Sequence, residues 1–149
     1  MHETIETKIA SLAWERIHQT LDRQGFAKLP PLLDSGQCLH LIGLYEREEL
    51  YRSKIEMSRY RFGEGEYKYF ASPLPSLVQQ LRASFYPELA QAANRWLARL
   101  GKEMRYPAAL DEFLASCHIK GQLRPTPLIL KYTEGKRGDY TTYGAPWRQ

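Results

Sequence analysis

Apolar residues near the start of the chain recur at the spacing of an α-helix with one face turned toward a core. They are Ile5, Ile9, Leu12, Ala13, Ile17 and Leu21. This period predicts one amphipathic helix, which we expect to end at Gly25 because glycine commonly follows the last helical turn. The stretch "GFAKLP" that begins at Gly25 predicts a short strand.

The stretch "DSGQ", residues 34–37, predicts the start of a second helix. Asp34 is expected to accept a hydrogen bond from the amide of the third helical residue while Gln37 reaches back, which is a capping box. The predicted helix carries apolar side chains at helical spacing and runs into the charged stretch "EREELYRSK". Those side chains are Cys38, Leu41, Ile42 and Tyr45.

The middle of the chain predicts a hairpin and a long helical segment. Strand-forming residues flank Gly63-Glu64-Gly65 in "IEMSRYRFGEGEYKYF", so we predict a hairpin over 55–70 with an irregular first strand. The segment 74–101 has helical apolar spacing, but Pro87 lies inside it. Since an interior proline costs about 3 kcal/mol, we expect two helical pieces joined at Tyr86-Pro87.

The end of the chain predicts a helix over 110–118 and a strand over 126–132. This strand is apolar on both faces, as in a sheet covered on both sides. It has no evident strand partner downstream. Helices, one hairpin and one late strand together predict an α+β fold.

Length and composition are those of one globular domain over 1–149. Cys38 and Cys117 form no CxxC pattern, which argues against a disulfide framework or zinc site and favours reduced thiols in the cytoplasm. No apolar run approaches the roughly 18 residues of a membrane span, so we expect no membrane partner. The net charge of +4 permits an anionic partner without requiring one.

The four histidines do not form a recognisable metal motif. His2, His18, His40 and His118 are scattered, and none is followed two positions later by Asp or Glu. Nucleotide-binding glycine motifs and the GxSxG nucleophile motif are also absent from the sequence. We expect the histidines to be surface or structural residues, and we predict no catalytic residue and no metal ligand.

Basic and aromatic residues interleave in the hairpin. Basic side chains bind phosphates and aromatic rings stack on bases, so the hairpin is a candidate nucleic-acid surface. The alternative is a hairpin that packs its rings on the core and leaves its charges in water. The candidates are Arg59, Arg61, Tyr67, Lys68 and Tyr69.

Several stretches together resemble one bacterial family of 2-oxoglutarate/Fe(II)-dependent oxygenases, relatives of prolyl hydroxylases described as acting on damaged nucleic acid. They are "GFAKLPPLLDSGQC", "MSRYRFGEGEYKYF", "PLPSLVQQLRASFYPELAQAANRW" and "GQLRPTPLILKYTEG". The resemblance implies helices followed by a double-stranded β-helix, or jelly roll. It also implies an Fe(II) centre with two histidines and one carboxylate, and a reaction of hydroxylation or demethylation, as in DNA repair.

In this family the strand that matches "PLILKY" leads into His-Gln-Asp, which supplies the first two iron ligands. In one alignment the corresponding positions here are Gly144 and Pro146, whose side chains have no ligand atom. In the other, Tyr143-Gly144 matches the family's Tyr-Gly after the ligands, and the ligand segment is deleted. Lys131, Tyr132 and Tyr140 match positions close to the cofactor pocket. The resemblance thus implies a member truncated before most of the jelly roll, with Fe(II) and 2-oxoglutarate for the full-length family and neither cofactor for this chain.

Three interpretations stay open. The chain is a truncated oxygenase without activity of its own, a non-enzymatic module that binds nucleic acid or protein, or half of a split oxygenase completed by another chain. An apolar strand whose partners are missing promotes association. We therefore expect self-association, or a completing chain, through residues 126–132.

Overall fold

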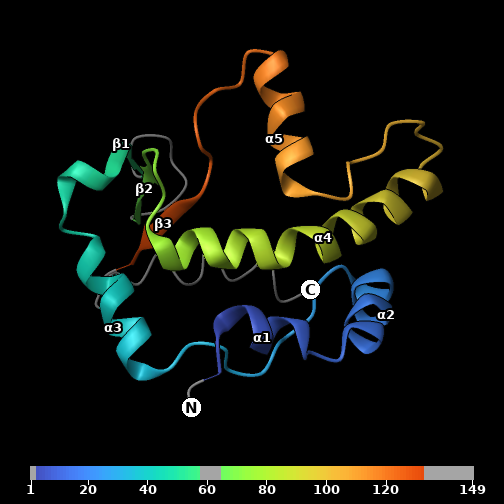
Figure 1. Ribbon diagram of the computed structural model, residues 1–149, viewed down its shortest axis with the longest axis horizontal. Coiled ribbons are helices and arrows are strands. Elements are labelled where there is room, and N and C mark those ends of the chain that lie inside the picture. The colour runs from blue at the N-terminus through green and yellow to red at the C-terminus, as the bar shows by residue number, and fades with distance from the viewer. Residues whose placement is uncertain (1–2, 58–64, 133–149) are drawn as a thin grey trace. The chain divides into compact units, whose positions relative to one another are not determined.

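The structure is a computed structural model that describes residues 3–57 and 65–132 (Figure 1). The chain divides into two compact units that alternate along the sequence. Unit 1 comprises Met1–Cys38 and Pro75–Leu123, and unit 2 comprises Leu39–Leu74 and Arg124–Gln149. The described elements are helices and one small antiparallel sheet of three strands, which confirms the α+β class. The single domain over 1–149 remains a prediction.

Unit 1 is helical and is organised around its longest helix. Its helices are α1 (Ile5–Ala10), α2 (Trp14–Gln24), α4 (Ser76–Arg99) and α5 (Leu110–Ile119). Each of α1, α2 and α5 packs against α4, with α1 and α2 on one side and α5 on the other (Figure 1). The buried apolar residues of this unit are Ile5, Ile9, Leu77, Ala90 and Ala92.

The predicted first helix is wrong in one respect, because the chain forms two helices with a break at residues 11–13. The Ser11 hydroxyl donates to the carbonyl of Thr7 at 2.7 Å, and the indole of Trp14 donates to the carbonyl of Ile9 at 2.8 Å. The Trp14 indole thus bonds the Ile9 carbonyl, which would accept from the Ala13 amide in a continuing helix, whereas the Thr7 carbonyl still accepts from the Ser11 amide as in a helix. The apolar period therefore continues through a turn in the backbone.

The end of α2 follows the prediction, but the strand expected after it does not form. Gly25 takes a left-handed conformation with φ of 82° and donates to the carbonyl of Leu21 at 2.8 Å. Residues 26–34 are then without helix or strand. Pro30 and Pro31 have no amide hydrogen to give to a sheet, which disfavours a strand at the end of this stretch.

The predicted capping box is confirmed at the start of α3 (Ser35–Leu44). The Gln37 amide donates to Asp34 Oδ1 at 2.7 Å, and the Asp34 amide donates to Gln37 Oε1 at 2.9 Å. The helix leads into unit 2, where Leu44 and Tyr45 are buried.

The predicted break at Pro87 is wrong, since α4 is continuous through it (Figure 1). Side chains on both sides of the proline are held by unit 1. The Tyr86 hydroxyl donates to the carbonyl of Pro107 at 2.8 Å, and Glu88 pairs with His18 at 2.6 Å. Such tertiary contacts offset the lost backbone hydrogen bond. The predicted helix over 110–118 is confirmed as α5.

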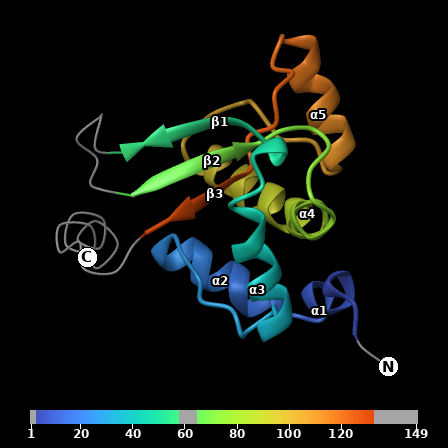
Figure 2. The ribbon, with the colours of Figure 1, turned by 90° about the vertical axis from the view of Figure 1, so that its left-hand side faces the viewer.

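Unit 2 contains the sheet, in the order β1-β2-β3 (Figure 2). The 3-10 helix η1 (Glu48–Leu50) leads into β1 (Tyr51–Glu56), which pairs antiparallel with β2 (Glu66–Phe70). This confirms the hairpin, although β1 begins earlier than predicted and its bulge lies between Tyr51 and Ser53. The tip, residues 58–64, is outside the described residues.

The late strand forms as β3 (Leu128–Lys131), shorter than the predicted 126–132. It pairs antiparallel with β2, with Lys68 opposite Ile129 and Tyr67 opposite Leu130. Its partner is thus upstream in the sequence, and β2 rather than β3 is the central strand.

Within the described residues, none of the helices combines the length and apolar character needed to cross a membrane.

Candidate functional site

The sheet of unit 2 has two chemically different faces, because successive side chains of a strand point to opposite sides. Glu66, Lys68 and Lys131 lie on the face that meets Tyr45, which we call the Tyr45 face. Tyr67, Tyr69, Leu128 and Leu130 lie on the opposite face, which we call the Tyr67–Tyr69 face. The residues predicted as one site are therefore divided between two surfaces.

Lys68 is buried on the Tyr45 face, with only 3% of its surface exposed. Its ammonium donates to the carbonyl of Tyr45 at 2.7 Å and to Glu48 Oε1 at 3.2 Å. It also lies 4.1 Å from the ring centre of Tyr45 and 5.1 Å from that of Tyr51, within the range of cation–π attraction. The ammonium is held inside the unit in this structure rather than presented to a phosphate.

Tyr45 connects the other charges of this face. Its hydroxyl donates to Glu66 Oε1 at 2.7 Å, and this hydrogen bond is the largest cause that lowers the pKa of Glu66. Lys54 lowers that pKa further through its own hydrogen bond and charge. Burial raises the pKa of Tyr45, and its hydrogen bond to Glu66 adds to the effect. Tyr45 thus stays a neutral donor and Glu66 an ionised acceptor.

Lys131 and Tyr132, both expected near a cofactor pocket, are not brought together. The Lys131 ammonium is 3.6 Å from Glu46 Oε1 and 5.1 Å from the ring centre of Tyr45. The Tyr132 ring instead lies beside the backbone of Gly65, and its hydroxyl is 3.9 Å from the sulfur of Met57. Tyr140 is outside the described residues. A shared role for these three in one pocket stays a prediction.

The Tyr67–Tyr69 face carries a pair of aromatic rings from the central strand. The two rings meet edge to face at 5.6 Å between centres. The guanidinium of Arg52 lies 4.4 Å from the ring centre of Tyr69, and its Nε donates to the carbonyl of Pro125 at 2.9 Å. Arg52 was missed in the sequence, because the predicted hairpin began at residue 55, whereas β1 already begins at Tyr51. Arg59 and Arg61 are outside the described residues.

His18 belongs to a polar network that joins α2 to α4. Its Nε2 is 2.6 Å from Glu88, and its Nδ1 is 2.8 Å from a guanidinium nitrogen of Arg95, which also binds Asp22. An arginine only donates, so Nδ1 must accept and Nε2 must carry the hydrogen toward Glu88. Both ring nitrogens are used structurally, as the sequence predicted for this residue. His40 and His118 are exposed on α3 and α5.

The residues do not fit the iron centre that the resemblance implies. An Fe(II) triad needs two histidines and a carboxylate directed to one point. Among residues 3–57 and 65–132, no group of three or more His, Cys, Asp or Glu side chains is placed to hold a metal. The whole sequence also lacks a His-x-Asp pair.

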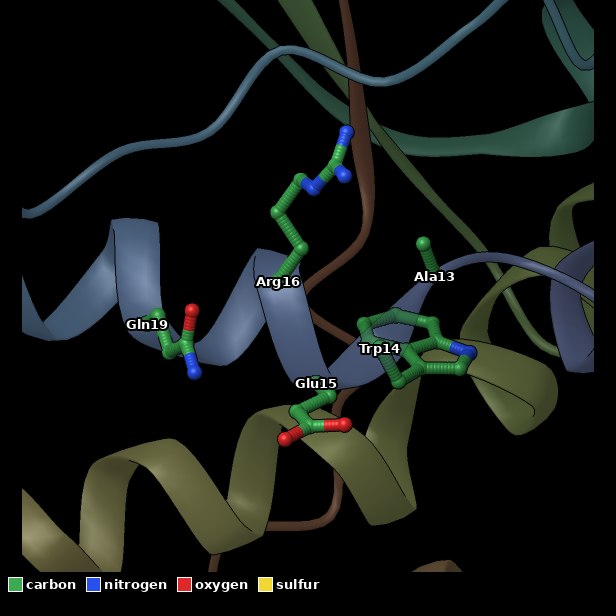
Figure 3. A pocket seen from close by; sticks show the side chains of 5 residues that line it. All are labelled: Ala13, Trp14, Glu15, Arg16 and Gln19. Carbon is green, nitrogen blue, oxygen red and sulfur yellow. The ribbon is translucent and has the colours of Figure 1, made fainter.

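A surface hollow of about 470 Å³ lies at the start of α2 (Figure 3). It is lined by Ala13, Trp14, Glu15, Arg16 and Gln19. Glu15 and Arg16 carry opposite charges, so the lining has no net charge. Ligand pockets usually combine side chains from several elements. This hollow uses a single short stretch of chain and includes none of the predicted site residues.

The sequence also matches a family model described as an oxygenase catalysing oxidative methylation of damaged DNA. The match covers residues 65–144, which is more than half of the chain. It includes β2 and β3, the strands that carry Tyr67, Lys68, Tyr69 and Lys131, as well as Tyr132 directly after β3.

Two curated relatives come from Mycobacterium tuberculosis: the uncharacterized protein MT2286 of strain CDC 1551 and the uncharacterized protein Rv2227 of strain H37Rv. Each is 46% identical over 63 residues, which is 42% of this chain. The chain spans 27% of the length of each relative. No solved structure matches the chain.

Proposed function

The chain belongs to the oxygenase family described as catalysing oxidative methylation of damaged DNA, and from this membership we propose a divided role for it. Its 149 residues supply flanking helices and the first sheet strands of a 2-oxoglutarate/Fe(II) oxygenase fold of the jelly-roll type. They do not form the iron centre. Oxygenase activity on DNA then requires ligands from outside these residues, on a longer protein or on a second polypeptide, as in a split oxygenase.

The observation that carries this proposal is the sheet of unit 2. The family match includes β2 and β3, which pair with each other. One face of this sheet is filled by Lys68 and Phe70, while Leu128 and Leu130 on the other face stay 38% and 48% exposed. Among the described residues, the two faces of the sheet are thus buried to different degrees, which supports a role as one layer of a two-layered fold. The two free cysteines agree with the proposed cytoplasmic setting.

We predict that these 149 residues alone bind neither Fe(II) nor 2-oxoglutarate with defined stoichiometry. The reason is the missing donor set, since a site must offer its full number of correctly placed ligands. Anaerobic calorimetry with Fe(II), alone and with 2-oxoglutarate, measures this, and an assay for succinate measures turnover. One iron bound per chain, with binding lost when His18, His40 or His118 is replaced by alanine, contradicts the proposal.

A second candidate function is binding of single-stranded nucleic acid by the Tyr67–Tyr69 face. The observation in its favour is the arrangement of two tyrosine rings and Arg52 on one side of the sheet. Aromatic rings stack on bases, and arginine adds attraction to both rings and phosphates. Arg52 here takes the place that the sequence gave to Lys68, whose ammonium is buried.

For this candidate we predict that Tyr69→Leu weakens binding of a fluorescent single-stranded oligonucleotide. Loss of one stacked base costs about 1–3 kcal/mol, which corresponds to roughly 5- to 150-fold in affinity. Anisotropy titrations at one fixed salt concentration measure the change. Phe26→Leu is the matched control, because Phe26 is an aromatic residue of unit 1 that is 54% exposed. Equal affinities of the two variants argue against this face as the binding surface.

A further inference from the structure

The outer edge of β3 presents backbone hydrogen-bonding groups in a defined pattern. The Phe70 amide donates to the carbonyl of Pro127 at 3.0 Å, so Phe70 on β2 and Pro127 just before β3 form a hydrogen-bonded pair of the ladder. Bonded and non-bonded pairs alternate along an antiparallel ladder. Ile129, opposite Lys68, therefore directs its backbone groups toward β2, whereas Leu128 and Leu130 direct theirs to the outer edge. No strand within residues 3–57 and 65–132 pairs with that edge.

The same two residues also present apolar side chains. Leu128 is 38% exposed and Leu130 is 48% exposed, both on the Tyr67–Tyr69 face. Within residues 3–57 and 65–132, this edge offers backbone N–H and C=O groups that no other strand pairs with, together with leucine side chains. Such an edge favours addition of another strand. The question is which strand fits it.

The sequence of the edge answers this, because Leu128-Ile129-Leu130 reads the same in both directions. In an antiparallel pair of two β3 strands related by a two-fold axis at Ile129, each Leu128 lies opposite Leu130 of the second copy. This register bonds all four outward N–H and C=O groups of the two leucines in each copy. Each Ile129 then lies opposite its equivalent on the other face.

The flanking residues fit this register too. One step beyond the leucines, Lys131 lies opposite Pro127 of the second copy, so no like charges face each other. Pro127 lacks an amide hydrogen, but its backbone is directed toward β2 and none is needed at the outer edge. We propose that β3 is an interface for a second copy of this chain, which joins the two sheets into one through residues 128–130.

The proposed contact between the two β3 strands is small, so we expect it to be weak. Stable interfaces bury about 1,200–2,000 Å² in total, and two strands of four residues bury much less. We expect a reversible dimer with a dissociation constant between about 10 µM and 1 mM. The inference rests on the geometry, side chains and sequence of the β3 edge, and it does not require the proposed oxygenase activity.

The test uses sedimentation equilibrium on the full chain and on two charge variants. Leu128→Lys with Leu130→Lys makes lysines face lysines in the proposed register, and Leu128→Glu with Leu130→Glu makes glutamates face glutamates. Each variant alone should be monomeric up to about 1 mM, while an equal mixture should form a heterodimer. Recovery of association in the mixture is specific to the pairing of Leu128 with Leu130.

A further variant guards against loss of folding by the charges. Leu130→Pro removes one outward amide hydrogen while leaving the bonds between β2 and β3, and edge strands tolerate such prolines. It should abolish dimers and keep the near-ultraviolet circular dichroism of the wild type. The proposal is overturned by a monomeric wild type at the highest concentration or by variants that dimerise like the wild type. A mixture that stays monomeric, or a wild type that associates only with a different polypeptide, also overturns it.

Discussion

Replacing Phe70 with alanine is expected to remove about 3–5 kcal/mol from the free energy of unfolding, as for other buried aromatic residues. Phe70 is only 1% exposed and its ring stacks on Tyr51 at 5.0 Å between centres. Alanine leaves a cavity at the end of β2, on the same face of the strand as Lys68. Because folded proteins are stable by only about 5–15 kcal/mol, this change should cost a large part of the total.

Urea unfolding followed by near-ultraviolet circular dichroism measures the effect of Phe70→Ala. Phe26→Ala is the control, since it removes the same ring from a position that is 54% exposed. We expect the midpoint of the control to stay near that of the wild type. Equal losses for the two variants would mean that the Tyr45 face of the sheet does not contribute a tightly packed core.

Replacing Gly65 with alanine is expected to cost about 1–3 kcal/mol, the usual range for overpacking. A Cβ atom at this position would lie 2.6 Å from the Tyr132 ring and 3.0 Å from the Met57 sulfur. The Tyr132 ring must then leave the backbone of Gly65. The glycine is needed here for close approach of a ring, and we expect the loss to depend on that ring.

A double-mutant cycle tests this dependence. In the background of Tyr132→Ala, the change Gly65→Ala should have little effect on the free energy of unfolding. Gly43→Ala is the control, because nothing lies within 4 Å of a Cβ there, and alanine in a helix is favoured over glycine by roughly 0.5–1 kcal/mol. The same cost for Gly65→Ala in both backgrounds would refute the contact as its cause.

The sequence predicted best those features that depend on neighbours along the chain. The capping box of Asp34 and Gln37 and the left-handed Gly25 each involve residues within a few positions, and both are present. The hairpin was also readable, since strand-forming residues on both sides of a glycine-rich turn identify it locally.

The errors arose where distant residues decide the outcome. Pro87 alone favours a broken helix, but the contacts of Tyr86 and Glu88 with segments far away keep α4 continuous. The late strand read as isolated because its partner β2 precedes it by some sixty residues of intervening helix and loop. Nothing in the local pattern of residues indicated that pairing.

The prediction of the candidate site was limited by the same dependence on distant residues. The sequence pattern placed Lys68 among the candidate phosphate-binding residues. Its register opposite Ile129 instead directs its ammonium toward the rings of Tyr45 and Tyr51 and the carbonyl of Tyr45. Arg52 reaches Tyr69 because β1 begins at Tyr51, four residues before the predicted hairpin. The residue types of the site were readable in the sequence, but the face on which each residue lies depends on the strand register.

The alternation of the two units along the chain has a consequence for synthesis on the ribosome. Unit 1 needs Met1–Cys38 together with Pro75–Leu123, and unit 2 needs Leu39–Leu74 together with the segment from Arg124 onward. The hairpin of β1 and β2 can form as soon as it emerges, because its contacts are local. The helices α1 and α2 must wait for α4, and β2 keeps an unpaired edge until β3 appears. During translation the nascent chain therefore exposes an incomplete sheet while unit 1 assembles, which is the interval in which chaperones bind such surfaces.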